Sequence, residues 1–311
     1  MPGIDTKQHT IPQFYLREFS SDQKNIYRYD KQAETAPEHL PIKAVQCHKG
    51  FYDIGRPNQK DGFVDEYLTN FEKWVAPKFQ EALTRLDEGR DIASLMEVIA
   101  VFIVVSYLRS EPMRDWADDF HKKITDFQLG QPTFREDAIN ELRSVESEAT
   151  AEEIDAAVDM LESTIKDIQP SMLQASLLLF NEFNLQEDYY RSLLQRKWIL
   201  YQASPDLLNY GFWTSDNPVV WYPNRKLLPG EGLGAMTTHT DIIFPLSKKY
   251  CLILPGDSWK DSPTWNRKIF FSIVNKEKVD QVNQRQYLRA ARFVYPCSSN
   301  YFLIRSLRSM K

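Results

Sequence analysis

A proline in one turn leaves an aspartate without its usual hydrogen-bond donor. In the segment Thr214–Val219, Asp216 stands two residues before Pro218. An Asp side chain in a turn commonly accepts a hydrogen bond from the N–H two residues ahead, and proline has no N–H. The carboxylate of Asp216 must therefore find another donor, a water or a ligand. It is either a structural group held by neighbouring side chains or backbone donors, or a carboxylate that takes part in chemistry.

Two basic side chains complete a candidate catalytic set. His9 is the first choice for a general base or a metal ligand, because imidazole gains and loses a proton close to neutral pH. A capping or core histidine is the alternative. Arg109 ends an apolar segment, where a buried guanidinium needs a partner; it could bind a phosphate or pair with a carboxylate of the chain. We expect His9, Arg109 and Asp216 to converge, with one of the glutamates Glu66 and Glu72, at the mouth between helices and sheet.

Such a set suits phosphodiester chemistry. An imidazole moves the proton, a guanidinium stabilises charge on oxygen, and carboxylates orient the base or hold a divalent metal ion. Glu66 and Glu72 are the candidate metal ligands, and a divalent metal is the candidate cofactor. Six residues along a helix turn the two glutamates about 120° apart, so they do not simply pair. For either glutamate alone, a solvated helix face is the alternative.

Composition restricts the class of protein. The net charge of −5 argues against broad electrostatic binding to nucleic acid, although it is compatible with a local basic cleft. Three widely spaced cysteines predict neither a disulfide framework nor a cysteine zinc site. The N-terminus has no apolar signal segment, and the longest apolar run, Ile99–Leu108, is too short to span a bilayer. We therefore expect a cytoplasmic protein without a membrane partner.

The candidate residues need elements that position them. Short apolar segments separated by Gly, Pro, Asn and Asp predict antiparallel strands; they are Trp198–Ala203, Gly211–Tyr222, Asp241–Leu246 and Tyr250–Leu254. Small strands are also expected near the N-terminus, at Ile26–Asp30, Ile42–Gln46 and Phe51–Ile54.

The middle of the chain predicts helices. An amphipathic stripe from Val64 to Leu86 carries Pro77, where a kink or break is expected. Leu95–Leu108 is apolar on nearly every side and predicts a central core helix. The fold class is therefore α+β: a central helical bundle packed on a mostly antiparallel sheet, formed largely by the C-terminal half plus short N-terminal strands. We expect a single domain over residues 1–311, with a charged helical insert at 130–170.

Three segments taken together resemble the domain-of-unknown-function 4238 family. These segments are Gln8–Ser20, Trp213–Val220 with Ile242–Ser247, and Val282–Ser298. The resemblance implies a fold and a candidate polar site, not a known reaction. It places His9 and Pro12 in the family's opening motif, Glu66 and Glu72 among its helical carboxylates, Arg109 and Arg114 in its arginine cluster, Asp216 and Pro218 in its turn, and Asn283 in its last segment. Arg114, Asn217 and Asn283 are then the expected substrate-binding residues.

A second resemblance concerns the spacing of Arg114 and His121. An Arg and a His seven residues apart are similar to the motif of HEPN ribonucleases, and two helical turns put both on one face. When three neighbouring spacings are allowed, about one such pair is expected by chance in a chain of this composition. The all-helical HEPN fold also fits the expected strands poorly, so ribonuclease motif and chance both remain open.

The sequence thus predicts an intracellular hydrolase. Its most favoured form is a metal-dependent or His-dependent nuclease or nucleotide-acting effector of the toxin or phage-defence type, with nucleic acid or a nucleotide as partner. The alternative is a non-enzymatic module that binds a ligand or a protein through the same polar cleft.

Overall fold

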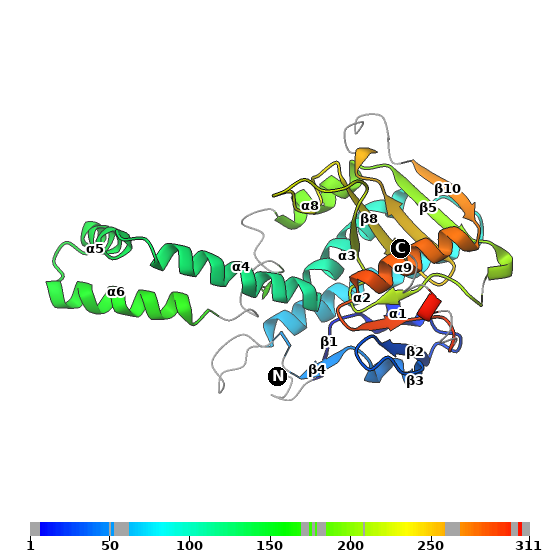
Figure 1. The fold of residues 1–311 in the computed structure, drawn as a ribbon, viewed down its shortest axis with the longest axis horizontal. Coiled ribbons are helices and arrows are strands. Elements are labelled where there is room, and N and C mark those ends of the chain that lie inside the picture. The colour runs from blue at the N-terminus through cyan, green and yellow to red at the C-terminus, as the bar shows by residue number, and fades with distance from the viewer. Residues whose placement is uncertain are drawn as a thin grey trace.

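The chain forms a body of sheets and helices from which a helical arm projects (Figure 1). The computed structural model describes residues 7–49, 51–52, 62–168, 174–175, 178, 185–207, 209–258, 268–299 and 304–306. Strands come mainly from the two ends of the chain, and helices from its middle. The α+β class predicted from the sequence is confirmed.

A five-stranded sheet forms the centre of the body. Its strand order is β10–β5–β9–β8–β7, antiparallel except for the parallel pair of β10 and β5. The strands are β5 (Trp198–Ala203), β7 (Val220–Pro223), β8 (Thr240–Pro245), β9 (Tyr250–Leu254) and β10 (Ile269–Val274). The predicted segments 198–203, 241–246 and 250–254 match strands of this sheet closely.

Helices cover both faces of this sheet, because its strands are apolar on both sides. Ile242 and Phe244 of β8 join one hydrophobic cluster, whereas Ile243 between them joins another. The first cluster contains residues of α1, α2 and α3; the second contains residues of α9. Alternate side chains of a strand point to opposite faces, so the sheet lies between these helices. The bounds are α1 Gln13–Arg17, α2 Phe63–Asp87, α3 Met96–Leu108, α8 Leu185–Leu194 and α9 Lys276–Arg289.

The N-terminal strands join the C-terminal ones in a second sheet. Its order is β3–β2–β11–β6, all antiparallel. A separate two-stranded ladder of β1 and β4 pairs His9 with Cys47. The bounds are β1 Lys7–His9, β2 Asn25–Asp30, β3 Glu38–Pro41, β4 Cys47–Lys49, β6 Thr214–Ser215 and β11 Phe293–Tyr295.

Short helix α1 anchors the N-terminal segment to the central sheet through Tyr15. Its ring stacks on Phe244 of β8, with 5.3 Å between centroids and 11° between planes. Its hydroxyl donates to the carbonyl oxygen of Pro245 at 2.7 Å and lies 2.9 Å from the hydroxyl of Thr214. A fully buried tyrosine needs such partners, so these contacts fix where the chain leaves β1.

The predicted helices are present, with one difference at Pro77. Helix α2 continues through this proline to Asp87 instead of breaking. A glycine that follows the last apolar residue of a helical stripe predicts the end of the helix, and Gly89 has a φ of 68° just beyond the end of α2, a conformation that glycine adopts without strain. The predicted core helix is α3, and most of its side chains are buried.

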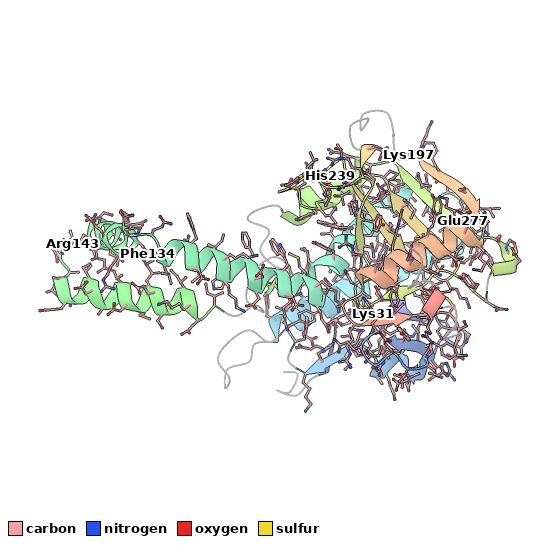
Figure 2. All side chains as sticks on the ribbon, viewed as in Figure 1. Lys31, Phe134, Arg143, Lys197, His239 and Glu277 are labelled. Carbon is pink, nitrogen blue, oxygen red and sulfur yellow. The ribbon has the colours of Figure 1, made fainter. Side chains whose placement is uncertain are left out.

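Three helices form the arm: α4 (Glu111–Leu129), α5 (Phe134–Val145) and α6 (Ala151–Lys166). Figure 2 shows that the arm extends away from the body, with Phe134 and Arg143 near its far end. Thr150 and Glu153 cap α6 reciprocally, as their spacing predicts. The predicted insert at residues 130–170 contains α5 and α6.

Among the described residues, no single helix is both long and apolar enough to cross a bilayer. Residues 93–108 and 111–129 together have the length and composition for it, but they bend by 57° at their junction.

Asn283 joins α9 to the strand segment that leads into β6. Its side chain is fully buried, accepts a hydrogen bond from the N–H of Trp213 at 2.8 Å, and donates to the carbonyl oxygen of Gly211 at 3.0 Å. Without Asn283, these two buried backbone groups would lose this hydrogen-bond partner. Asn283 is therefore a structural clamp between α9 and the segment before β6.

We expect Asn283→Ala to lower the free energy of unfolding by about 2–4 kcal/mol, because a buried N–H and a buried C=O each lose their partner. Arg289→Ala, exposed on the same helix, is the control and should change stability by less than about 0.5 kcal/mol. Urea denaturation measures both. Equal effects of the two substitutions would contradict the clamp.

Candidate functional site

A polar pocket of about 440 Å³ lies between the N-terminal segment, α2 and the end of α3. Three of its lining side chains were expected at a site: His9, Glu72 and Arg109. The others are Gln13, Phe14, Arg17, Asp65, Leu68, Thr69, Lys73 and Ala76. Its size is within the range of small-molecule sites in proteins.

His9 is half-buried at the end of β1, and its Nε2 atom has two different neighbours. The carbonyl oxygen of Lys43 lies 3.3 Å away, and the side-chain nitrogen of Gln13 lies 3.3 Å away. The carbonyl oxygen interacts with Nε2 when that atom carries a proton, and the amide N–H when it does not. The Nε2 atom of His9 thus has one acceptor and one donor within reach.

Arg109 is 2% exposed and ties three segments together at the floor of the pocket. Its Nη1 donates to Oε1 of Glu72 at 2.7 Å, and its Nη2 donates to the backbone carbonyl of His9. Its Nε donates to the hydroxyl of Tyr52 at 3.3 Å, and that hydroxyl donates to the carbonyl oxygen of Arg109 at 3.1 Å. Burial raises the pKa of Tyr52, which favours the protonated hydroxyl that this arrangement needs. The guanidinium thus positions the backbone of His9 beside α2.

The two glutamates of α2 have different environments. Glu72 lines the pocket and forms an ion pair with Arg109, whereas Glu66 is exposed and does not line the pocket. The 120° offset between them explains this difference. Asp65 lies seven residues before Glu72, two full turns, and faces the pocket in place of Glu66. The metal-ligand role expected for Glu66 is therefore not supported by its position.

Metal binding would require several ligands at one place. Within the described ranges, no group of three or more His, Cys, Asp and Glu side chains could hold a metal ion. The carboxylate of Glu72 is already engaged by Arg109.

Several pocket residues were not expected from the sequence. Gln13 and Arg17 are four residues apart on α1. Asp65, Thr69, Lys73 and Ala76 follow the face of α2 that carries Glu72. Arg17 and Lys73 are exposed cations without an ion-pair partner among the residues described. The sequence feature that would have predicted the α2 residues is their helical spacing from Glu72.

Asp216 is not in the pocket. It is 1% exposed, and its carboxylate accepts hydrogen bonds from three consecutive backbone N–H groups, those of Ala291, Arg292 and Phe293, at 2.8, 2.6 and 2.6 Å. Burial raises the pKa of Asp216 to about 6, although these N–H groups act to lower it. The donors replace the one that Pro218 removes. Asp216 thus fixes the chain between α9 and β11, and the expected convergence with His9 and Arg109 is wrong.

The remaining expected substrate-binding residues also lie outside the pocket. Asn217 donates from Nδ2 to the carbonyl oxygen of Arg289 at 3.1 Å, and Asn283 is the clamp described above. Arg114 lies over the ring of Phe51, 3.5 Å from its centroid. Their positions give no support to contact with a ligand in this pocket.

The Arg114 and His121 pair is spread along α4. His121 has its Nε2 atom 3.0 Å from the carbonyl oxygen of Ile165, where α4 packs against α6. Neither residue lines the pocket that contains His9. The comparison with HEPN ribonucleases therefore adds nothing to the site at His9.

The fold and the pocket define an α+β protein in which a half-buried histidine, a buried arginine and the glutamate that pairs with it line one polar pocket. The chain belongs to the family described as proteins of unknown function, DUF4238, whose model matches residues 7–300. This confirms the resemblance found in the sequence. Neither the curated proteins nor the solved structures contain a significant match to the chain.

We expect Arg109→Ala to lower the free energy of unfolding by about 3–5 kcal/mol, because Glu72, the carbonyl of His9 and Tyr52 all lose a buried partner. Arg17→Ala, an exposed arginine of the same pocket, is the control and should cost less than about 0.5 kcal/mol. Thermal and urea unfolding measure both. A similar loss in the two variants would show that Arg109 has no special structural role.

Asp216→Asn tests the buried carboxylate through pH. Because the pKa of Asp216 in the folded protein is raised to about 6 from its ordinary 3.8, the folded state binds the proton more tightly between these values. The free energy of unfolding of the wild type should therefore fall, relative to the variant, as pH rises from about 4 to about 6, and then level off.

Urea denaturation at a series of pH values measures this difference, with the exposed Asp115→Asn as control. A wild-type-minus-variant difference that is flat, or that grows with pH, would contradict the raised pKa.

Proposed function

We propose that this protein is a His-dependent hydrolase that cleaves a phosphate ester of a nucleotide or nucleic acid in the pocket around His9. The observation that carries the proposal is the placement of His9 Nε2 near an acceptor and a donor, in a pocket also lined by Arg17 and Lys73, two cations without an ion-pair partner among the residues described. A group that is stable in both protonation states can take up and return a proton.

The proposed reaction uses each of these groups. Arg17 and Lys73 bind the phosphate oxygens, and a water attacks phosphorus while His9 Nε2 takes its proton. The bond from phosphorus to the leaving oxygen breaks, and the imidazolium returns the proton to that oxygen. Arg109 acts by positioning: three of its five N–H groups donate to Glu72, to the backbone of His9 and to Tyr52. A role as a toxin or in phage defence follows from the proposal only where the substrate is nucleic acid.

A second function is favoured by the location of Asp216. Asp216 lies outside the pocket and Glu72 is paired with Arg109, so the exposed cations of the pocket are placed for recognition of an anion. A non-enzymatic module that binds a phosphate-bearing ligand would use the same cations.

The test compares the wild type with His9→Ala and His9→Gln on single-stranded RNA, DNA and nucleoside triphosphates, with and without added divalent metal. We expect turnover by the wild type and a loss of about 100-fold or more in both variants. His39→Ala removes an exposed histidine outside the pocket and should leave the rate unchanged. Isothermal titration with the same nucleotides runs in parallel.

Binding that is weakened by Lys73→Ala, without turnover, would favour the binding module over the hydrolase. Turnover that persists in His9→Ala, or the absence of both binding and turnover, would contradict the proposal.

A further inference from the structure

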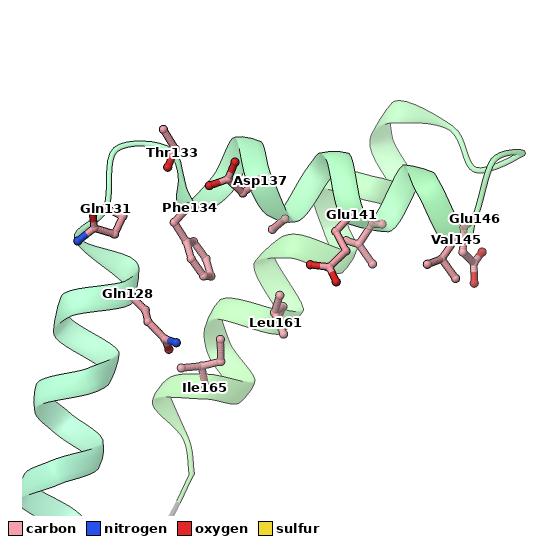
Figure 3. A pocket seen from close by; sticks show the side chains of 12 residues that line it. Gln128, Gln131, Thr133, Phe134, Asp137, Glu141, Val145, Glu146, Leu161 and Ile165 are labelled. Carbon is pink, nitrogen blue, oxygen red and sulfur yellow. The ribbon is translucent and has the colours of Figure 1, made fainter.

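The arm carries an open apolar groove between its helices, well away from the pocket at His9. It has a volume of about 650 Å³ and is walled by the end of α4, by α5 and by α6. Figure 3 shows Phe134 of α5 pointing into the space above Leu161 and Ile165 of α6, with Gln128 of α4 on the other side. Helix α5 has no buried residue at all. Its apolar face is therefore only partly covered within the arm.

An exposed apolar ridge on α4 leads to this groove. Trp116, Phe120 and Ile124 are 50%, 48% and 39% exposed and follow each other at four-residue intervals, with Gln128 of the groove wall next. The rings of Trp116 and Phe120 stack at 5.0 Å. Twelve residues of helix extend about 18 Å. Contiguous exposed apolar side chains of this kind mark interaction sites in soluble proteins.

The negative charge of the arm indicates the kind of partner that the groove would bind. Residues 130–170 contain 11 acidic and three basic side chains, a net charge of −8. Since the whole chain has −5, the rest of it carries +3. Three carboxylates stand on the groove rim, Asp137, Glu141 and Glu146. None of them has an ion-pair partner in the described chain, whereas Arg135 pairs with Asp155, Asp159 and Glu162 of α6.

We propose that the groove of the arm, with the ridge of α4, binds a basic amphipathic helix of a partner protein. An apolar groove accepts the apolar face of such a helix, and the rim carboxylates are placed to pair with lysines or arginines that flank that face. The groove and the ridge offer the length of several helical turns. This inference is independent of the reaction proposed for His9.

The test uses a fluorescein-labelled 18-residue helix with Leu on one face and Lys on the other, and fluorescence anisotropy with the full chain. Leu161→Ser removes a groove side chain and should weaken binding at least fivefold. Met160→Ser is the matched control: it is an equally apolar, 72% exposed neighbour on α6 that does not line the groove, and it should change binding less than twofold. Circular dichroism checks that the helices remain.

A second variant covers the case in which Leu161→Ser disturbs the arm. The double substitution Glu141→Gln with Glu146→Gln leaves packing intact and should weaken binding at least threefold while reducing its salt dependence. A peptide with Glu in place of Lys should bind at least tenfold more weakly. Equal losses in Leu161→Ser and Met160→Ser, equal binding of the Glu and Lys peptides, or no binding would overturn the proposal. So would self-association of the protein that Leu161→Ser abolishes, because the occupant would then be a second copy.

Discussion

A single buried guanidinium sets the geometry of the candidate site. Arg109 ends α3 inside the body, and its donors bind α2, β1 and Tyr52. A buried charge is tolerated only when such partners are all in place. The arrangement of these three segments is therefore coupled: moving any one of them leaves a charge or a carbonyl unpaired. The pocket at His9 lies among the segments that Arg109 joins and opens to solvent.

Other buried polar side chains also join segments that are distant in the sequence, by binding backbone groups. Asp216 accepts from three main-chain N–H groups about 75 residues away, and Asn283 bonds both sides of the segment before β6. Among the residues described, Arg196 donates to main-chain carbonyls, including those of Thr240 and Thr237. The sequence suggested Asp216 and Asn283 for chemistry, yet both side chains bind the backbone. The half-exposed groups around His9 keep capacity for a ligand.

Local signals in the sequence predicted local structure well. The capping pair at Thr150, the stop at Gly89 and the all-apolar α3 depend only on neighbouring residues, and all three are present. The missing donor at Pro218 also predicted that Asp216 needs other partners. It could not identify them, because Ala291 to Phe293 reach Asp216 only through the tertiary fold. Helix geometry alone would have favoured Asp65 over Glu66 as the companion of Glu72.

The central claim is that His9 faces a ligand-binding pocket held in place by Arg109. Proton–nitrogen NMR of the imidazole side chains, assigned with His9→Gln, tests it most directly during titration with a nucleoside monophosphate. The account predicts a saturable shift of the His9 signals, with those of His39 and His239 unchanged. Signals of His9 that stay constant, or that move no more than those of His39 and His239, would contradict it.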